Sequence, residues 1–363
     1  MTPKLTFFIA RHSNSGVPLA QIRLAKSLSR RGYPVEFVIG YVPNDVAVPE
    51  IKGVKVINLD VPRTFKLILP VFFYIKKNMP DVIFSAEDHL NAVVTLAVIF
   101  TGSKAKLSTS SRVTPYDTYS NTIFSKRWVL KQINKVLWYR VDALVCVSKD
   151  MVKQYEDIFG ATKYQCLYNV VCDSELYRKM VVSVDDPWLN DRSIPLVITA
   201  GRLAPEKCFP DLIIAMKILL RAKEVRLVIL GDGPLRADLD TLIKEEGLDE
   251  TVRLLGFQNN PYKYFSKARV FVLSSCVEGL PNVLVEAMAC GCTPVSTDCP
   301  TGPREVLKNG RYGYLVPMHD PVKMAIAIKM AIEQPVPLKG LKDAIQPFTE
   351  ELVIKRHKEI LGF

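Results

Sequence analysis

The sequence contains no apolar run long enough to cross a membrane. Its longest mainly apolar runs are residues 67–75 and 92–100, whereas a membrane-spanning helix needs ~20 apolar residues. Residues 2–4 lead directly into the strand-like residues 5–9, without the apolar core and small-residue cleavage site of a secretion signal. These absences predict a cytoplasmic protein that does not span a membrane.

Signatures of several catalytic and metal-binding classes are also missing. The sequence has no Gly-x-Ser-x-Gly turn, no Walker loop and no zinc-binding helix. Its eight cysteines favour reduced thiols over a disulfide framework. Cys290, Cys292 and Cys299 have no accompanying histidine. Asp238 and Asp240 lie two positions apart in a predicted helix, where side chains do not face each other. We therefore expect no metal site.

Acidic residues are scarce in the first half of the chain. The chain has 48 Lys and Arg against 37 Asp and Glu, a formal net charge of +11. Residues 1–180 hold 25 of these cations and 14 of the acids, and residues 181–363 hold 23 of each. Because the whole excess lies in the first half, we expect that half to face nucleic acid, a phospholipid surface or a phosphorylated substrate.

The length and composition favour two folded domains. A chain of 363 residues is too long for one compact core, and 48% apolar with 23% charged residues is typical of a globular protein. Short β-rich segments alternate with amphipathic segments of helical length almost from end to end, which is the pattern of βαβ units. The sequence predicts an α/β protein with two open parallel sheets.

The predicted elements form two series. The first has strands near 5–10, 35–39, 54–57, 82–85, 106–109, 143–147 and 165–168, with helices near 17–31, 67–79, 89–101, 122–140 and 149–159. The second has strands near 196–201, 226–230, 252–255, 270–273, 294–296 and 312–316, with helices near 208–222, 235–247, 260–266, 282–290, 303–308 and 321–333.

A polar, proline-containing stretch at 184–195 separates the two series, and we interpret it as a linker. The predicted domains are residues 1–183 and 184–346, followed by a tail, 347–363, with a last helix at about 349–361. In two open parallel sheets, ligands bind beyond the carboxyl ends of the strands. We expect the ligand site in the cleft where those ends of the two domains meet.

The densest chemical signal is the stretch from Glu278 to Glu286. Pro281 suits a first helical position, so free amide groups at Asn282, Val283 and Leu284 are expected to point into the cleft, where they can hold a phosphate. Glu278 in the loop and Glu286 in the helix can hold the hydroxyls of a sugar and of a ribose. The alternative is two ordinary solvated glutamates.

A pair of cations follows the first strand of the second domain. Arg202 comes directly after that strand and Lys207 starts the next helix, so both can reach the same cleft. Two fixed cations there would neutralise charge on a departing diphosphate. The alternative is a surface Arg and Lys around a turn. The nearby Gly231-Asp232-Gly233-Pro234 lacks a third glycine, so we interpret it as a tight strand-to-helix turn rather than a dinucleotide loop.

The first domain offers weaker candidates. Gly16 lies in the loop of residues 11–18 and lets backbone approach an acceptor or a phosphate; the alternative is a plain turn. In the stretch Glu87-Asp88-His89, an acid or His89 could hold a sugar hydroxyl or act as general base, or His89 could simply cap the following helix. Arg112 is a further candidate of the same type.

The predicted helix around residues 125–140 has five cations, no acid and three aromatic residues. With the basic and aromatic segments 63–66 and 72–77, it predicts a face that rests on anionic lipid. The alternative is a core helix with a basic outer side. No nucleic-acid-binding module is recognisable.

Taken together, these motifs resemble the family 4 glycosyltransferases. The resemblance rests on residues 201–207, 231–234 and 255–257 and on Glu278 and Glu286 with seven residues between them, in that order and spacing. Residues 291–295 and 299–305 are similar to the branch that builds bacterial surface polysaccharides. The resemblance implies the GT-B fold, with two facing Rossmann-like domains and the active site in the cleft between them.

The resemblance also implies particular roles. Arg202 and Lys207 would hold the diphosphate of a UDP-sugar, Glu286 its ribose and Glu278 its sugar, while Phe257 and Gln258 would flank the base. Transfer would retain the anomeric configuration without a required metal or other cofactor. Many relatives have a histidine in the first-domain cleft, and the stretch at 87–89 leaves Glu87, Asp88 and His89 as alternatives for that position. The last helix would cross back onto the first domain.

The resulting hypothesis is a retaining glycosyltransferase at the inner face of the plasma membrane. It would move a hexose or N-acetylhexosamine from UDP to a lipid-linked or polysaccharide acceptor in surface glycan synthesis, with His89 as a catalytic candidate beside Arg202, Lys207 and Glu278. A non-catalytic protein that binds a nucleotide-sugar or a lipid surface is the main competitor. A nicotinamide enzyme is a third possibility, which the missing glycine disfavours.

Overall fold

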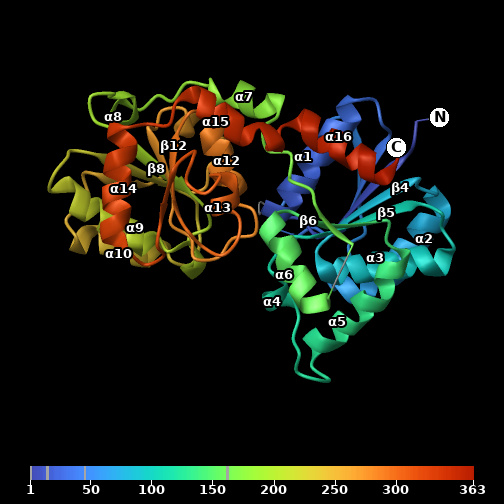
Figure 1. Ribbon diagram of the computed structural model, residues 1–363. Coiled ribbons are helices and arrows are strands. Elements are labelled where there is room, and N and C mark those ends of the chain that lie inside the picture. The colour runs from blue at the N-terminus through green and yellow to red at the C-terminus, as the bar shows by residue number, and fades with distance from the viewer. Residues whose placement is uncertain (1, 14–15, 45, 161–162) are drawn as a thin grey trace. The chain divides into compact units, whose positions relative to one another are not determined.

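The computed structural model describes residues 2–13, 16–44, 46–160 and 163–363. The contacts among these residues divide the chain into two compact units (Figure 1). Unit 1 contains the described residues up to Val170 together with Glu350–Phe363, and unit 2 is Val171–Thr349. Each unit has one parallel sheet flanked by helices, so the predicted α/β class is confirmed.

Unit 1 is built on a seven-stranded sheet of order β3-β2-β1-β4-β5-β6-β7. Its strands are β1 (Leu5–Arg11), β2 (Val35–Tyr41), β3 (Val54–Asn58), β4 (Val82–Ala86), β5 (Lys106–Ser111), β6 (Ala143–Cys146) and β7 (Tyr164–Cys166). Its helices are α1 (Gly16–Arg30), η1 (Thr64–Leu67), α2 (Ile68–Asn78), α3 (Asp88–Thr101), α4 (Pro115–Thr118), α5 (Lys126–Leu137), η2 (Trp138–Arg140), α6 (Lys149–Phe159) and α16 (Glu350–Leu361).

Both faces of this sheet are covered, which explains why its strands are almost continuously apolar. Alternate residues of a strand point to opposite faces. Phe7 of β1 belongs to a core formed with α1 and α16, and the next residue, Phe8, belongs to a separate core formed with α2 and α3. The two cores fix the register of the central strands.

Unit 2 is built on a six-stranded sheet of order β10-β9-β8-β11-β12-β13. Its strands are β8 (Leu196–Ala200), β9 (Arg226–Leu230), β10 (Val252–Leu254), β11 (Val270–Leu273), β12 (Thr293–Thr297) and β13 (Tyr314–Val316). Its helices are α7 (Ser174–Met180), α8 (Pro187–Asn190), η3 (Pro205–Lys207), α9 (Phe209–Leu220), α10 (Arg236–Glu245), α11 (Tyr262–Phe265), α12 (Asn282–Ala289), α13 (Pro303–Val306), α14 (Pro321–Glu333), α15 (Leu338–Ile345) and η4 (Gln346–Phe348).

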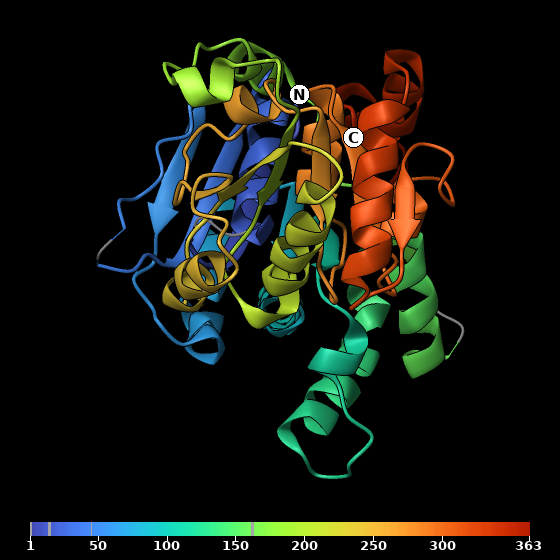
Figure 2. The ribbon, with the colours of Figure 1, turned by 90° about the vertical axis from the view of Figure 1, so that its left-hand side faces the viewer.

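The unit 2 sheet is likewise packed on both faces. Val197, Leu227 and Val270 form one core with α9, α10 and α14. On the other face, Phe271 of β11 contacts Phe265 of α11 edge to face, with ring centroids 5.5 Å apart. Figure 2 gives a second view of the α14 helix and the strands beside it. Because β11 lies between β8 and β12, the loops that follow these strands lie at one edge of the sheet.

The boundary between the units lies at residues 170 and 171, earlier than the boundary at 183 and 184 predicted from the sequence. Residues 171–183 include α7, which packs against α11 of unit 2. The expected linker at 184–195 contains α8, whose Trp188 ring lies 4.9 Å from the guanidinium carbon of Arg226 and 4.1 Å from that of Arg253. These residues are part of unit 2, and their polar composition reflects exposure to solvent rather than a free linker.

The chain returns to unit 1 at Glu350, where α16 begins. The carboxylate of Glu350 forms an ion pair with Arg31 at 2.5 Å, and Val353 and Leu361 are buried in the unit 1 core. Helix α16 packs against α1 and β5. Over the described residues, every helix is too short or too polar to span a bilayer.

Candidate functional site

The candidate site in unit 2 is formed by two loops at the carboxyl edge of its sheet. One loop follows β8 and contains η3; the other follows β11 and leads into α12. The amide of Cys276 donates to the carbonyl oxygen of Glu206 at 2.9 Å, and the Ser274 hydroxyl donates to the carbonyl oxygen of Lys207 at 2.6 Å. The two loops are therefore fixed to each other through their backbones.

The centre of this site is an ion pair between Lys207 and Glu278. The Lys207 ammonium nitrogen lies 2.6 Å from Glu278 Oε1, and their side chains are 22% and 11% exposed. The Thr301 hydroxyl donates to the backbone carbonyl of Glu278, which holds the loop from the other side. The structure thus brings together two of the residues that the sequence singled out, and Glu278 is not an ordinary solvated glutamate.

Arg202 lies in the same turn, directly after β8. Its side chain is exposed, while the flanking Leu203 and Ala204 are buried and fix the backbone of the turn. The carbonyl oxygen of Arg202 accepts a hydrogen bond from the amide of Ala204 at 2.8 Å. An exposed guanidinium on a fixed turn is placed to meet an anion from solvent.

The start of α12 offers fewer amides than the sequence predicts. The helix begins at Asn282, with Pro281 as its N-cap rather than its first residue. The amide of Asn282 donates to Leu280 O at 2.9 Å and that of Leu284 donates to Pro281 O at 3.0 Å, because the chain turns tightly around Pro281. Within the part of the chain that the structure describes, the amide of Val283 has no backbone acceptor.

Glu286 lies one turn further into α12 and is 8% exposed. The Tyr262 hydroxyl of α11 donates to Glu286 Oε1 over 3.5 Å, a long hydrogen bond. The carboxylate oxygens of this buried acid are hydrogen-bond acceptors, which suits them to hydroxyl groups. Glu286, like Glu278, is not a solvated surface residue.

Phe257 and Gln258 follow β10 at the same edge of the sheet. The Gln258 amide nitrogen donates to Leu255 O at 2.8 Å, and the Tyr264 hydroxyl lies 3.1 Å from Gln258 Oε1. The Phe257 ring is half-exposed. An exposed ring beside a fixed amide can stack on a planar base and hydrogen-bond to its edge.

The turn at residues 231–234 has a structural role. An added Cβ on Gly231, whose φ is +138°, would lie 1.8 Å from the carbonyl oxygen of Gly201. The amide of Leu203 donates to Asp232 O at 2.9 Å. The turn therefore packs directly against the loop that carries Arg202 and Lys207, and its interpretation as a tight strand-to-helix turn is confirmed.

In unit 1, Gly16 is the first residue of α1 and is exposed. Asn14 and Ser15 of the same loop lie outside the described residues. His12, at the end of β1, is buried, and burial lowers the pKa of its imidazole. Its amide donates to the carbonyl oxygen of Tyr41 at 3.0 Å.

The structure separates the three candidates at 87–89. Asp88 is buried and accepts hydrogen bonds from the Ser111 and Tyr155 hydroxyls, each at 2.6 Å. Burial raises the pKa of Asp88, and the two hydrogen bonds oppose that shift. Glu87 is the N-cap of α3 and His89 is its second residue, so His89 does not cap the helix. Both Glu87 and His89 are exposed. Asp88 is thus held by the protein itself, which leaves Glu87 and His89 as the residues that can meet a ligand.

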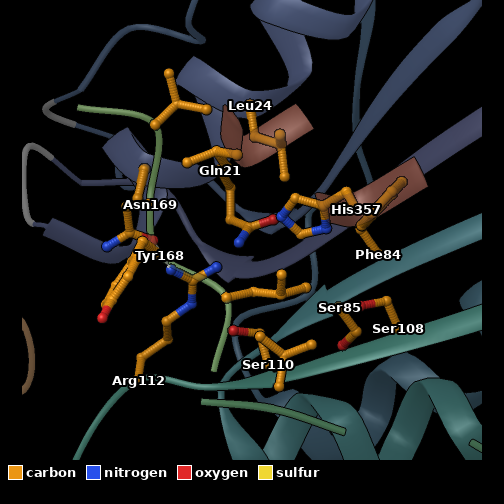
Figure 3. Close-up of a pocket in the computed structure, with 15 residues that line it drawn as sticks. Gln21, Leu24, Phe84, Ser85, Ser108, Ser110, Arg112, Tyr168, Asn169 and His357 are labelled. Carbon is orange, nitrogen blue, oxygen red and sulfur yellow. Dashed lines mark hydrogen bonds between the residues drawn. The ribbon is translucent and has the colours of Figure 1, made fainter. Parts of the chain in front are cut away.

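Figure 3 shows a further polar pocket of unit 1 that sequence reasoning found only in part. Gln21 from α1, Arg112 after β5 and His357 from α16 point into a cavity about large enough for one water molecule. The Arg112 guanidinium donates to the side-chain oxygen of Asn169. Burial, aided by the Arg112 charge, lowers the pKa of His357 to about 3. Gln21 and His357 lie on ordinary amphipathic helices and carry no motif that a sequence could reveal.

Comparisons with known proteins identify the family. Residues 186–346 match the profile described as glycosyl transferases group 1. A Campylobacter jejuni protein named as an N-acetylgalactosaminyltransferase of a diphospho-undecaprenol-linked sugar is 33% identical over 255 residues, 70% of this chain and 67% of that protein. A second C. jejuni N-acetylgalactosaminyltransferase is 25% identical over 91% of this chain and 89% of its own length.

Solved structures show the same fold over nearly the whole chain. The lipopolysaccharide outer core galactosyltransferase WaaB has a TM-score of 0.75 at 19% identity, with 99% of each chain covered. Anabaena HepE in complex with UDP has a TM-score of 0.79 at 19% identity, again with 99% of each chain covered.

Among the relatives found by sequence, an uncharacterised glycosyltransferase of Methanocaldococcus jannaschii is 30% identical, and this chain matches only 61% of its length.

These findings define a glycosyltransferase of the GT-B fold. The chain belongs to the glycosyl transferases group 1 family, and the family 4 resemblance found in residues 201–305 is confirmed. The two Rossmann-like units that this resemblance implies are also confirmed.

Proposed function

We propose that this glycosyltransferase transfers an N-acetylhexosamine or hexose from a UDP-sugar to a lipid-linked acceptor during surface glycan synthesis, with retention of configuration and without a required metal. The observation that carries the proposal is the Lys207–Glu278 pair, set between the end of β8 and the start of α12. A cation and an acid 2.6 Å apart can contact the diphosphate and the sugar of one donor molecule.

The remaining residues of the unit 2 site fit the other parts of a UDP-sugar. Arg202 and Lys207 would neutralise the diphosphate as it leaves, aided by the amide of Val283. Glu286 would accept hydrogen bonds from the ribose hydroxyls, and Glu278 from the sugar. The Phe257 ring and the Gln258 amide would contact the uracil base.

The names of similar proteins support the donor and acceptor classes. Two relatives from C. jejuni are named as N-acetylgalactosaminyltransferases that act on undecaprenol-linked saccharides. Anabaena HepE has been solved with UDP and with UDP-glucose. An N-acetylhexosamine on UDP and a polyprenyl diphosphate acceptor are therefore the first substrates to test.

The test is a transfer assay with purified protein. UDP-GlcNAc, UDP-GalNAc, UDP-glucose and UDP-galactose are each incubated with short saccharides on polyprenyl diphosphate, and both UDP release and the extended lipid are measured. We expect one donor to be favoured, an α-linked product by NMR and equal rates with and without added Mg²⁺ or Mn²⁺. Tight UDP binding with no turnover on any acceptor would instead identify a non-catalytic binding protein.

We also propose that unit 1 rests on an anionic membrane surface. Helix α5 buries only Asn134 and Leu137 along its length, so it is not a core helix. Figure 1 shows α5 and the loop before it standing out from the rest of unit 1. This segment exposes large apolar side chains beside its cations: Ile123, Phe124, Val129, Ile133, Val136 and Tyr139. Such a surface suits the boundary between lipid headgroups and acyl chains.

A further inference from the structure

Two cysteines and a histidine meet beside the Lys207–Glu278 pair, although they are far apart in the sequence. Cys208 Sγ, Cys276 Sγ and a ring nitrogen of His319 all lie within 4.8 Å of one another. Cys208 directly follows Lys207, and Cys276 precedes Glu278 by two positions. His319 lies between β13 and α14. The roles proposed for the glycosyl transfer leave these three side chains without a function.

The backbone holds this cluster in an uncommon conformation. Cys208 has φ +48° and His319 has φ +55°, in the left-handed region that favours glycine. Non-glycine residues are kept there only where the surrounding structure determines them, and such residues gather at functional sites. Cys276 is fixed differently, since its amide donates to the carbonyl oxygen of Glu206 at 2.9 Å.

The donor atoms match the ligands of a thiophilic divalent cation. Two thiolates and one imidazole are a common ligand set of zinc, with the fourth position left to solvent. A tetrahedral zinc ion, with Zn–S of about 2.3 Å and Zn–N of about 2.0 Å, keeps its ligand atoms roughly 3.5–3.8 Å apart. Ligand atoms no more than 4.8 Å apart reach that spacing when they approach one another by at most about 1.3 Å.

A carboxylate already orients the imidazole. The Nδ1 atom of His319 lies 3.0 Å from the Asp211 carboxylate of α9. A carboxylate on one ring nitrogen fixes the tautomer and leaves the other nitrogen to ligate a metal. The cluster is also open to entry from solvent, because His319 is exposed and Cys276 is half-buried.

We propose that Cys208, Cys276 and His319 form a zinc site in unit 2 that ties the turn after β8 to the loop after β11. Because Lys207 and Glu278 lie on those same two segments, the bound ion holds the ion pair in place without touching it. The ion fixes the position of the two loops and takes no part in the transfer step, so it does not conflict with a transfer reaction that needs no metal as catalyst. It also stands independently of the proposed substrates.

A disulfide between Cys208 and Cys276 is the competing use of the two thiols. A disulfide gives no role to His319 or to the Asp211 carboxylate that orients it. The imidazole beside both sulfur atoms therefore favours the metal.

The experiment uses the untagged full-length protein, reduced and stripped with a chelator. Titration with zinc in competition with a chromophoric chelator is expected to show one equivalent bound per chain. Cobalt added instead is expected to give a thiolate-to-cobalt charge-transfer band and the visible bands of a tetrahedral ion. The spectrum comes from the unsubstituted protein, so it does not depend on how any variant folds.

Variants then assign the ligands. Cys208→Gly and His319→Asn suit the left-handed backbone, and together with Cys276→Ser each is expected to lower the zinc affinity by at least ~100-fold. Asp211→Asn is expected to lower it by about 10–100-fold. Cys166→Ser, a thiol of unit 1, is the control and leaves binding unchanged.

Two results would overturn the site: no zinc or cobalt uptake by the reduced protein, or uptake that survives all three ligand substitutions. A Cys208–Cys276 disulfide in the untreated protein, with no metal uptake after reduction, would assign the two thiols to redox chemistry instead. None of these readouts uses sugar transfer, so a failed substrate assay leaves the zinc result unaffected.

Discussion

The ammonium of Lys207 lies 2.6 Å from the carboxylate of Glu278, although 71 positions separate the two residues in the chain. They meet because β8 and β11 are neighbours in the unit 2 sheet and run in the same direction. Each side chain is mostly removed from water, so each charge depends on the other or on a bound ligand.

Removing the Lys207 ammonium should abolish most of the turnover. Lys207→Ala deletes the cation proposed to stabilise the leaving diphosphate, and loss of one such group typically costs about 10²–10³ in kcat. Glu278 is then left without its partner, which we expect to lower the free energy of unfolding by about 1–3 kcal/mol. Steady-state kinetics with the favoured UDP-sugar and urea unfolding measure the two effects.

The matched control is Lys217→Ala, which removes the α9 lysine that is paired with Glu246 at the surface of the same unit. Its kcat should stay within about twofold of the parent. Turnover by Lys207→Ala close to that of the control would contradict the role assigned to Lys207.

Two glycines of adjacent turns should respond to alanine by very different amounts. At Gly231 a Cβ would lie 1.8 Å from the carbonyl oxygen of Gly201, and φ is +138°. We expect Gly231→Ala to lower the free energy of unfolding by roughly 3 kcal/mol or more. At Gly201 a Cβ meets only ordinary contacts, 3.6 Å from Phe209 and 3.8 Å from Lys207, so Gly201→Ala should cost less than about 1 kcal/mol. Urea unfolding of both variants tests the difference; equal losses would show that the turn relaxes.

Most of the secondary structure was predictable from the sequence, because the regular spacing of apolar residues determines the longer strands and helices. The strands expected at 226–230 and 270–273 are observed with those bounds. Four short helices, α4, α7, α8 and α15, were missed, because their stability comes from packing and not from their own sequence. Helix α15 is an example: it follows Pro337, and its buried residues Leu341 and Ile345 pack it into the unit, where it contacts α12.

The site could be predicted only for residues that directly follow a predicted strand, because the carboxyl ends of parallel strands lie at the same edge of a sheet. Lys207 and Glu278 each follow a predicted strand, so a shared sheet edge could be expected. The cluster of Cys208, Cys276 and His319 could not, because no local spacing links three residues that meet only through the strand order. The free amides expected at the start of α12 depended on Pro281 being helical, and its actual place as N-cap redirects two of them.

Protonation of His357 in the unfolded chain should lower the free energy of unfolding in mild acid. Burial lowers the pKa of His357 from 6.5 to about 3. The folded state therefore keeps the ring neutral, and no stability is lost above pH 6.5. As the pH falls from 6.5 toward 3, the unfolded chain binds a proton that the folded chain does not, so stability decreases. Between pH 7.5 and 5.5 this one group should lower the free energy of unfolding by about 1.4 kcal/mol.

The measurement is urea unfolding at the two pH values for the parent and for His357→Gln, which cannot titrate in this range. The loss between pH 7.5 and 5.5 should be smaller in the variant by about 1.4 kcal/mol. Val353→Ala, from the same face of α16, is expected to lower stability equally at both pH values and to keep the parent's pH dependence. A His357→Gln variant with the parent's pH dependence would show that the ring is accessible to protons in the folded state.

Two acidic substitutions among the exposed apolar side chains of α5 should weaken the binding of the protein to anionic lipid. Ile133→Glu and Val136→Glu together remove apolar area that would contact acyl chains and add two negative charges near a negative surface. At ~1 kcal/mol per charge close to the membrane, the partition coefficient should fall by at least about 30-fold.

Flotation with vesicles containing phosphatidylglycerol measures that coefficient. Binding by the parent should weaken as salt rises from 0.1 to 1 M, because the screening length shortens from about 10 to about 3 Å. Val322→Glu, which adds one acid at an equally exposed apolar position of α14 in unit 2, should bind as the parent does. If the parent does not float, or if it floats equally at both salt concentrations and after both α5 substitutions, the exposed apolar side chains of α5 serve a partner other than anionic lipid.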